Sequence, residues 1–171
     1  SNDAPIGHTA MTGLVIGALN TDYEFVFPVP ITLGLLLEDF ETGDFSAFDW
    51  IHSGDDEWSI QSDDVYSGVF AAKSGDIGHN QTSELSVMMN ILYEGDLTFQ
   101  AMASSEQGGS GAIYDFLEFY IDDESADLTI GGETEWTEYS VTIPTGEHSL
   151  RWVYQKDGAQ SIGQDCAWID R

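Results

Sequence analysis

Most of the side chains in this sequence that could do chemistry are carboxylates. Of its 171 residues, 31 are Asp or Glu and only 4 are Lys or Arg, which gives a formal net charge of −27. Hard divalent cations such as Ca²⁺ bind several carboxylate and carbonyl oxygens at once. A glycosidase also needs two carboxylates, but among so many acids no local pattern selects a pair. The composition therefore favours cation binding over acid–base catalysis.

The sequence gives little indication of a catalytic cysteine or of a zinc site. The single cysteine, Cys166, lies in a segment that matches no local signature of a catalytic thiol, so a buried core cysteine is the simpler interpretation. The four histidines are scattered, without the i, i+4 helical pairing of a zinc site, and the sequence has neither an EF-hand loop nor a glycine-rich phosphate loop. We therefore expect a protein that is not an enzyme.

The aromatic residues suggest carbohydrate binding as an alternative function. A sugar site presents aromatic rings on a flat or grooved face, flanked by amide and carboxylate groups that form hydrogen bonds. Aromatic side chains in sandwiches more often belong to the core, so this alternative stays open. The candidate ligand-binding residues are Trp136, Tyr120, Trp50 and Trp58.

The charge excludes two classes of partner. Nucleic acids and anionic membrane surfaces require clustered Lys or Arg, and this acidic protein has only Lys73, Arg151, Lys156 and Arg171. No apolar run approaches the ~20 residues that a membrane-spanning helix needs, so we expect no membrane insertion. The sequence does not begin with Met and shows no signal segment, so it is expected to be a mature or excised piece of a longer protein.

The elements that position these residues are predicted to be strands. Short runs rich in β-branched and aromatic residues alternate with Gly, Asp and Ser clusters, whereas helical spacing is hard to find. The predicted strands are 13–19, 23–29, 33–40, 58–61, 70–73, 83–92, 96–103, 113–121, 128–130, 136–143, 149–155 and 166–170. Many short strands separated by turns predict an all-β fold of two packed antiparallel sheets.

Alternation within the strands predicts which side chains face the core. Trp136 falls on the polar face of its strand. The apolar faces of three strands are Leu117, Phe119 and Ile121; Tyr139, Val141 and Ile143; and Leu150, Trp152 and Tyr154. These faces are expected to fill the core, although the aromatic face of 149–155 could also line a groove.

A domain boundary is predicted between residues 34 and 35. Residues 1–34 are apolar and comparatively poor in acid, and they contain Pro28 and Pro30, which favour an edge strand or an extended linker. This segment is interpreted as an N-terminal arm, a linker, or the closing strands of a preceding immunoglobulin-like module. Residues 35–171 are expected to form the β-sandwich.

Three segments, taken in order, resemble a known family. They are Glu38-Asp39-Phe40-Glu41-Thr42-Gly43-Asp44-Phe45, the stretch from Tyr66-Ser67-Gly68 to Ser74-Gly75, and the stretch from Lys156-Asp157-Gly158 to Asp165-Cys166-Ala167-Trp168-Ile169-Asp170. The sequence resembles the jelly-roll modules of bacterial secreted and surface proteins, notably the cleaved-adhesin domains of gingipain-type proteinases, and more distantly MAM domains. The resemblance implies a concanavalin-like jelly-roll β-sandwich with structural calcium, exported to the cell surface or medium.

The resemblance also implies where the calcium lies. It brings the early acidic motif, with Asp39 and Glu41 two residues apart on an extended strand, near Asp165 and Asp170. These four residues are the predicted calcium ligands, with Asp157 and Asp123 as reserves. The family pattern continues beyond the final Trp-Ile-Asp, whereas this sequence stops at Arg171, so the last strand is expected to be short.

The leading hypothesis is a non-catalytic, calcium-stabilised extracellular module that mediates binding or adhesion for a larger secreted or cell-surface bacterial protein. Its partners would be a cell-surface glycan or protein, or neighbouring modules of the same polypeptide. One alternative is a structural subunit of an extracellular assembly that self-associates when residues 1–34 add strands to a neighbour. The other is a carbohydrate-binding module.

Overall fold

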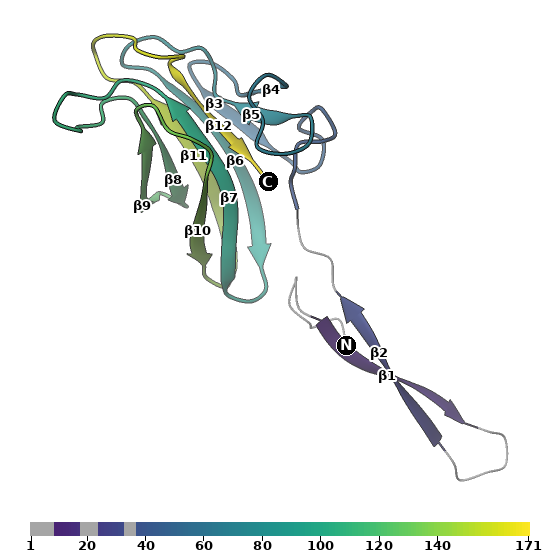
Figure 1. Cartoon of the computed structure of the whole chain (residues 1–171). Helices are drawn as coiled ribbons and strands as arrows, with labels where there is room; N and C mark the ends of the chain where they lie inside the picture. Colours follow the sequence, from purple (N-terminus) through teal and green to yellow (C-terminus); the bar gives the residue numbers. More distant parts are fainter. Residues whose placement is uncertain (1–8, 18–23, 33–36) are drawn as a thin grey trace. The chain divides into compact units, whose positions relative to one another are not determined.

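The computed structural model describes residues 9–17, 24–32 and 37–171 (Figure 1). By its internal contacts the chain divides into two units, Ser1–Leu37 and Glu38–Arg171, and each is described by itself. The predicted boundary between residues 34 and 35 falls within 33–36, outside the described residues, and stays a prediction. The described part contains no helix long and apolar enough to cross a membrane.

The described residues of the first unit form an antiparallel pair of strands, β1 (Thr9–Gly17) and β2 (Glu24–Thr32). Thr9 lies opposite Thr32, and Gly17 lies opposite Glu24. Pro28 and Pro30 both lie within β2, and because they are two residues apart, the N–H groups they lack would point to the same edge of the strand.

The second unit is a β-sandwich of two five-stranded sheets (Figure 1). One sheet has the strand order β10-β7-β12-β5-β4 and the other β3-β6-β11-β8-β9, and all the pairings are antiparallel. The strands are β3 (Ile51–Gly54), β4 (Ser59–Gln61), β5 (Ala71–Lys73), β6 (Thr82–Ile91), β7 (Gly95–Ser104), β8 (Phe116–Ile121), β9 (Glu124–Gly131), β10 (Thr137–Ile143), β11 (Gly146–Gln155) and β12 (Cys166–Asp170). The predicted all-β, two-sheet antiparallel sandwich is confirmed.

The core lies between the two sheets and is formed by every second side chain of the strands. The three apolar faces expected to point inward all belong to the core or pack against it. Trp152 lies at the centre of an aromatic group, with ring centroids 4.8 Å from Phe119, 5.5 Å from Phe99 and 5.8 Å from Trp50. The face of β11 that could have lined a groove is therefore a core face.

One predicted strand is wrong in its described part, and one strand was not predicted. Residues 37–40, the described part of the predicted strand 33–40, form no strand, because Phe40 adopts a left-handed backbone (φ 54°) and a turn follows it. The Glu38 carboxylate accepts a hydrogen bond from the Phe40 N–H, which holds this bend. The sequence analysis also missed β3, a four-residue strand whose side chains are mostly exposed and therefore show no apolar alternation.

Candidate metal centre and binding surfaces

Three carboxylates converge at one end of the sandwich. Glu106 follows β7, Asp115 precedes β8 and Asp157 follows β11, and one oxygen of each lies within 4.8 Å of the others. An isolated antiparallel bridge between Gln107 and Ile113 draws the first two residues together. The third is held because the backbone N–H of Asp157 donates to Asp115 Oδ1 at 2.8 Å.

Two of these carboxylates are buried and each has one unpaired oxygen. Glu106 is 4% exposed and Asp115 is fully buried. Glu106 Oε1 accepts a hydrogen bond from the Gln160 amide at 2.7 Å, whereas Glu106 Oε2 and Asp115 Oδ2 have no partner within the described chain. Burying an ionised oxygen without a partner is costly, so a positively charged partner would stabilise these two atoms.

The pKa of Glu106 also indicates that a bound cation would stabilise the cluster. Burial raises the pKa of Glu106, and the neighbouring Asp157 and Asp115 carboxylates raise it further, against a smaller opposing effect of His79 and Lys156. Calcium binds oxygens at 2.3–2.6 Å, so two ligands on opposite sides of one ion are ~5 Å apart. The separations within the cluster and its all-oxygen donor set therefore fit Ca²⁺.

The structure brings Glu41 and Asp170, two of the predicted ligands, to a single loop. Asp170 Oδ2 accepts hydrogen bonds from the backbone N–H groups of residues 66 and 67, both at 3.1 Å. Glu41 Oε1 accepts them from residues 69 and 70, at 2.8 and 3.0 Å. Asp170 is 1% exposed, and its Oδ1 has no partner within the described residues. Burial and the Glu41 charge raise the pKa of Asp170, while the two backbone hydrogen bonds oppose this rise.

The other two predicted ligands have different surroundings. Asp39 Oδ1 accepts the backbone N–H of Glu41 at 3.2 Å, across a turn rather than along an extended strand. Asp165 is ion-paired with the buried Lys156 ammonium at the opposite end of β12 from Asp170. Five residues of strand separate the two aspartates by about 16 Å, so the four predicted residues cannot surround one ion.

Sequence reasoning missed Glu106 and Asp115 and held Asp157 only in reserve. The available signal was that Glu106 and Asp115 flank the glycine-rich stretch 107–112. This stretch forms a loop closed by an antiparallel bridge, which brings the two acids together. The other reserve, Asp123, is exposed in the turn between β8 and β9.

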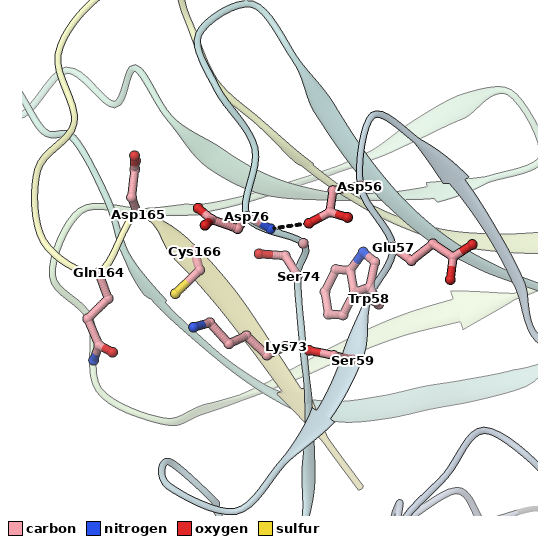
Figure 2. A pocket seen from close by; sticks show the side chains of 11 residues that line it. Asp56, Glu57, Trp58, Ser59, Lys73, Ser74, Asp76, Gln164, Asp165 and Cys166 are labelled. Carbon is pink, nitrogen blue, oxygen red and sulfur yellow. Dashed lines mark hydrogen bonds between the residues drawn. The ribbon is translucent and has the colours of Figure 1, made fainter.

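A polar pocket of about 560 Å³ lies beside the start of β12 (Figure 2). In Figure 2 the Lys73 side chain extends toward Cys166, and burial raises the pKa of the Cys166 thiol to about 11. The thiol is therefore protonated near neutral pH and is a poor nucleophile. Among the described residues, the carboxylates that line this pocket do not converge as those of Glu106, Asp115 and Asp157 do.

Two of the candidate sugar-binding rings belong to the core. Trp58 also lines the pocket but is only 3% exposed, so its ring offers no face to a sugar. Trp50 packs against the core, and its Nε1–H donates to Glu38 Oε2 at 2.9 Å.

The other two candidates lie outside the core. Tyr120 is covered by the Arg151 guanidinium, 4.8 Å from its ring centroid, and its hydroxyl donates to Glu118. Trp136 is half-buried and pairs with the exposed ring of Tyr66 at 6.2 Å. Trp136 is therefore the candidate with a second exposed ring beside it.

Comparisons with known proteins find matches among solved structures. No protein-family model and no curated protein matches the sequence. The K1 and K3 cleaved adhesin domains of Lys-gingipain from Porphyromonas gingivalis W83 are 14% and 16% identical, with TM-scores of 0.57 and 0.55, and in each case 78% of this chain aligns with 92% of the domain. The secreted serine protease VesC from Vibrio cholerae is 15% identical with a TM-score of 0.55; 96% of this chain aligns with 33% of VesC.

At these identities the likeness concerns the fold. The jelly-roll resemblance to cleaved adhesin domains is confirmed at that level. The chain spans about a third of the length of VesC.

Proposed function

We propose that this chain is a non-catalytic, calcium-stabilised binding or adhesion module of a larger bacterial protein that is secreted or displayed at the cell surface. The observation that carries the proposal is the pair of buried carboxylates, Glu106 and Asp115, each with an unpaired oxygen, in a cluster with a third acid, Asp157. The fold shared with cleaved adhesin domains supports the adhesion role. The buried, protonated Cys166 supports a non-catalytic one.

Calcium has two candidate positions in this proposal. The first is formed by Glu106, Asp115 and Asp157, where each residue supplies a carboxylate oxygen. The second is the loop held by Glu41 and Asp170, where the unpaired oxygen Asp170 Oδ1 could bind the ion. Neutralising either cluster in a chain of net charge −27 also reduces long-range repulsion.

Calcium is expected to raise the melting temperature of the protein. With an affinity typical of extracellular sites, ~0.1 mM, a hundredfold excess of calcium stabilises the fold by about 2.7 kcal/mol. For a domain of this size that is a shift of roughly 5–10 °C. Differential scanning calorimetry in CaCl₂, MgCl₂ and EDTA, at matched ionic strength, measures it. Equal melting temperatures in all three would refute the calcium proposal, and an equal response to magnesium would show a general charge effect.

The first unit favours a second candidate function, strand addition in an extracellular assembly. Within the described residues, β1 and β2 pair only with each other, each over nine residues. A two-stranded hairpin is marginally stable alone and leaves two edges open to a further strand. Such edges are the surfaces that β-augmentation uses.

Strand addition predicts self-association that depends on residues 1–34. Sedimentation velocity over a wide concentration range is expected to show oligomers of the full chain and a monomer of the chain that lacks this segment. A full-length protein that remains monomeric at the highest concentration would remove this candidate.

A further inference from the structure

We propose that the ring pair Tyr66–Trp136 is a stacking platform for the sugar rings of a neutral polysaccharide. This inference rests on the proposed function, because it names the ligand class of the same binding module. Tyr66 lies in the loop between β4 and β5, Trp136 lies directly before β10, and neither ring belongs to the core. Trp136 is a sugar-binding candidate predicted from the sequence, and in the structure the Tyr66 ring lies beside it.

The ring geometry suits an apolar sugar face. The centroids of Tyr66 and Trp136 are 6.2 Å apart, with an interplanar angle of 58°. Tyr66 is 47% exposed and Trp136 is half-buried, so the supporting structure holds the indole while the phenol is open to solvent. Two tilted rings at this spacing form a shallow angled surface on which the C–H face of a sugar can pack.

One exposed carboxylate, Glu138, and two buried polar side chains, Gln100 and Asp170, lie near the rings. Glu138 on β10, Gln100 on β7 and Asp170 on β12 occupy opposing positions on three adjacent strands. Their side chains therefore lie on the same face of the sheet, and Trp136 stands two residues before Glu138, just outside β10. The Gln100 amide donates to Glu138 Oε2 at 3.3 Å, and Glu138 is exposed, so its carboxylate can also accept a sugar hydroxyl.

The charge around the rings selects a neutral ligand. Carboxylates of Glu138, Asp170 and Glu41 surround the platform or support its loop, and the protein as a whole carries a net charge of −27. An anionic polysaccharide would be repelled, whereas sugar hydroxyls are good donors to carboxylates.

The ring pair is connected to the second candidate ion position through Asp170, which is hydrogen-bonded to the loop that contains Tyr66. Asp170 Oδ2 accepts hydrogen bonds from the backbone N–H groups of Tyr66 and Ser67, so this carboxylate holds the loop backbone that carries the phenol ring. An ion at Asp170 Oδ1 would hold that carboxylate, and through it the loop, in one position. Calcium is therefore expected to strengthen sugar binding by ordering the platform without touching the sugar.

Affinity electrophoresis of the full chain in gels that contain neutral polysaccharides tests the inference. The probes are xylan, mannan, laminarin and arabinogalactan stripped of acidic sugars, with alginate and polygalacturonate as anionic comparisons. We expect retardation by at least one neutral polymer and by neither anionic one. Trp136→Ala and Tyr66→Ala are expected to weaken binding at least about tenfold. Because Tyr66 is largely exposed, its variant guards against a loss that merely reflects unfolding.

The matched control is Tyr120→Ala, which removes the aromatic candidate on the other sheet and is expected to leave binding unchanged. Melting curves confirm that each variant is folded. No retardation by any neutral polymer, retardation only by the anionic ones, or loss only in Tyr120→Ala would overturn the inference.

Binding experiments with and without calcium distinguish this inference from the proposed function. Asp170→Asn or EDTA is expected to weaken binding severalfold. If calcium raises the melting temperature but no neutral polymer binds, the proposed function stands and the inference fails. If EDTA changes neither melting nor binding while Trp136→Ala still abolishes retardation, the platform stands and the calcium role fails.

Discussion

Replacing Trp152 by alanine is expected to lower the free energy of unfolding by about 3–5 kcal/mol, the cost typical of removing a large buried aromatic side chain. Trp152 is 4% exposed, and its ring contacts those of Phe119, Phe99 and Trp50, which come from both sheets and from the segment before β3. Its removal leaves a cavity where the two layers meet, and rigid strands on both sides cannot collapse into it.

Urea denaturation followed by far-ultraviolet circular dichroism, at constant calcium, measures this loss. Met88→Ala is the control, because Met88 is 50% exposed on the neighbouring strand β6 and its truncation leaves no cavity. That variant is expected to stay within about 0.5 kcal/mol of the wild type. A comparable loss in both variants would show that Trp152 has no special place in the core.

Replacing Glu106 by glutamine is expected to have opposite effects with and without calcium. In EDTA at neutral pH the substitution removes a buried charge repelled by Asp157 and Asp115, so the variant melts at a higher temperature than the wild type. In calcium the variant lacks a carboxylate ligand, so the calcium-dependent rise in melting temperature is lost or greatly reduced. The two melting curves are therefore expected to change order.

The pH dependence follows from the direction of the shift. The pKa of Glu106 is higher in the folded protein than its ordinary value of 4.5. Without calcium, the folded state binds a proton at a pH where the unfolded state does not, so lowering the pH through the raised pKa toward 4.5 stabilises the wild type relative to Glu106→Gln. With calcium the ionised form is required, so calcium stabilisation weakens over the same range.

Melting temperatures measured from neutral pH to about 4.5, in EDTA and in calcium, test both effects. Glu94→Gln is the matched control, since Glu94 is exposed between β6 and β7 and has the same change in charge. A Glu106→Gln protein that is less stable than the wild type in EDTA, and that still responds fully to calcium, would contradict the assignment of Glu106 to a metal centre.

Alternation along single strands was enough to predict the fold class and much of the core. Leu150, Trp152 and Tyr154 recur every second residue on β11, and all three are buried. This information is local, because the side chains of a strand alternate between its two faces whatever the strand pairs with. The composition likewise gives the large negative charge, from which we predict that nucleic acid is not a partner.

The placement of the carboxylates depended on the tertiary structure. Asp165 and Asp170 are close in sequence, yet they lie at opposite ends of β12, and Asp165 forms an ion pair with Lys156. Glu106 and Asp157 are 51 residues apart, yet loops after β7 and β11 bring them together. Tyr66 and Trp136 likewise meet only across the fold. Strand periodicity specifies which face a residue occupies, whereas strand order and loop path decide which residues share a site, and those depend on long-range pairing that no local pattern encodes.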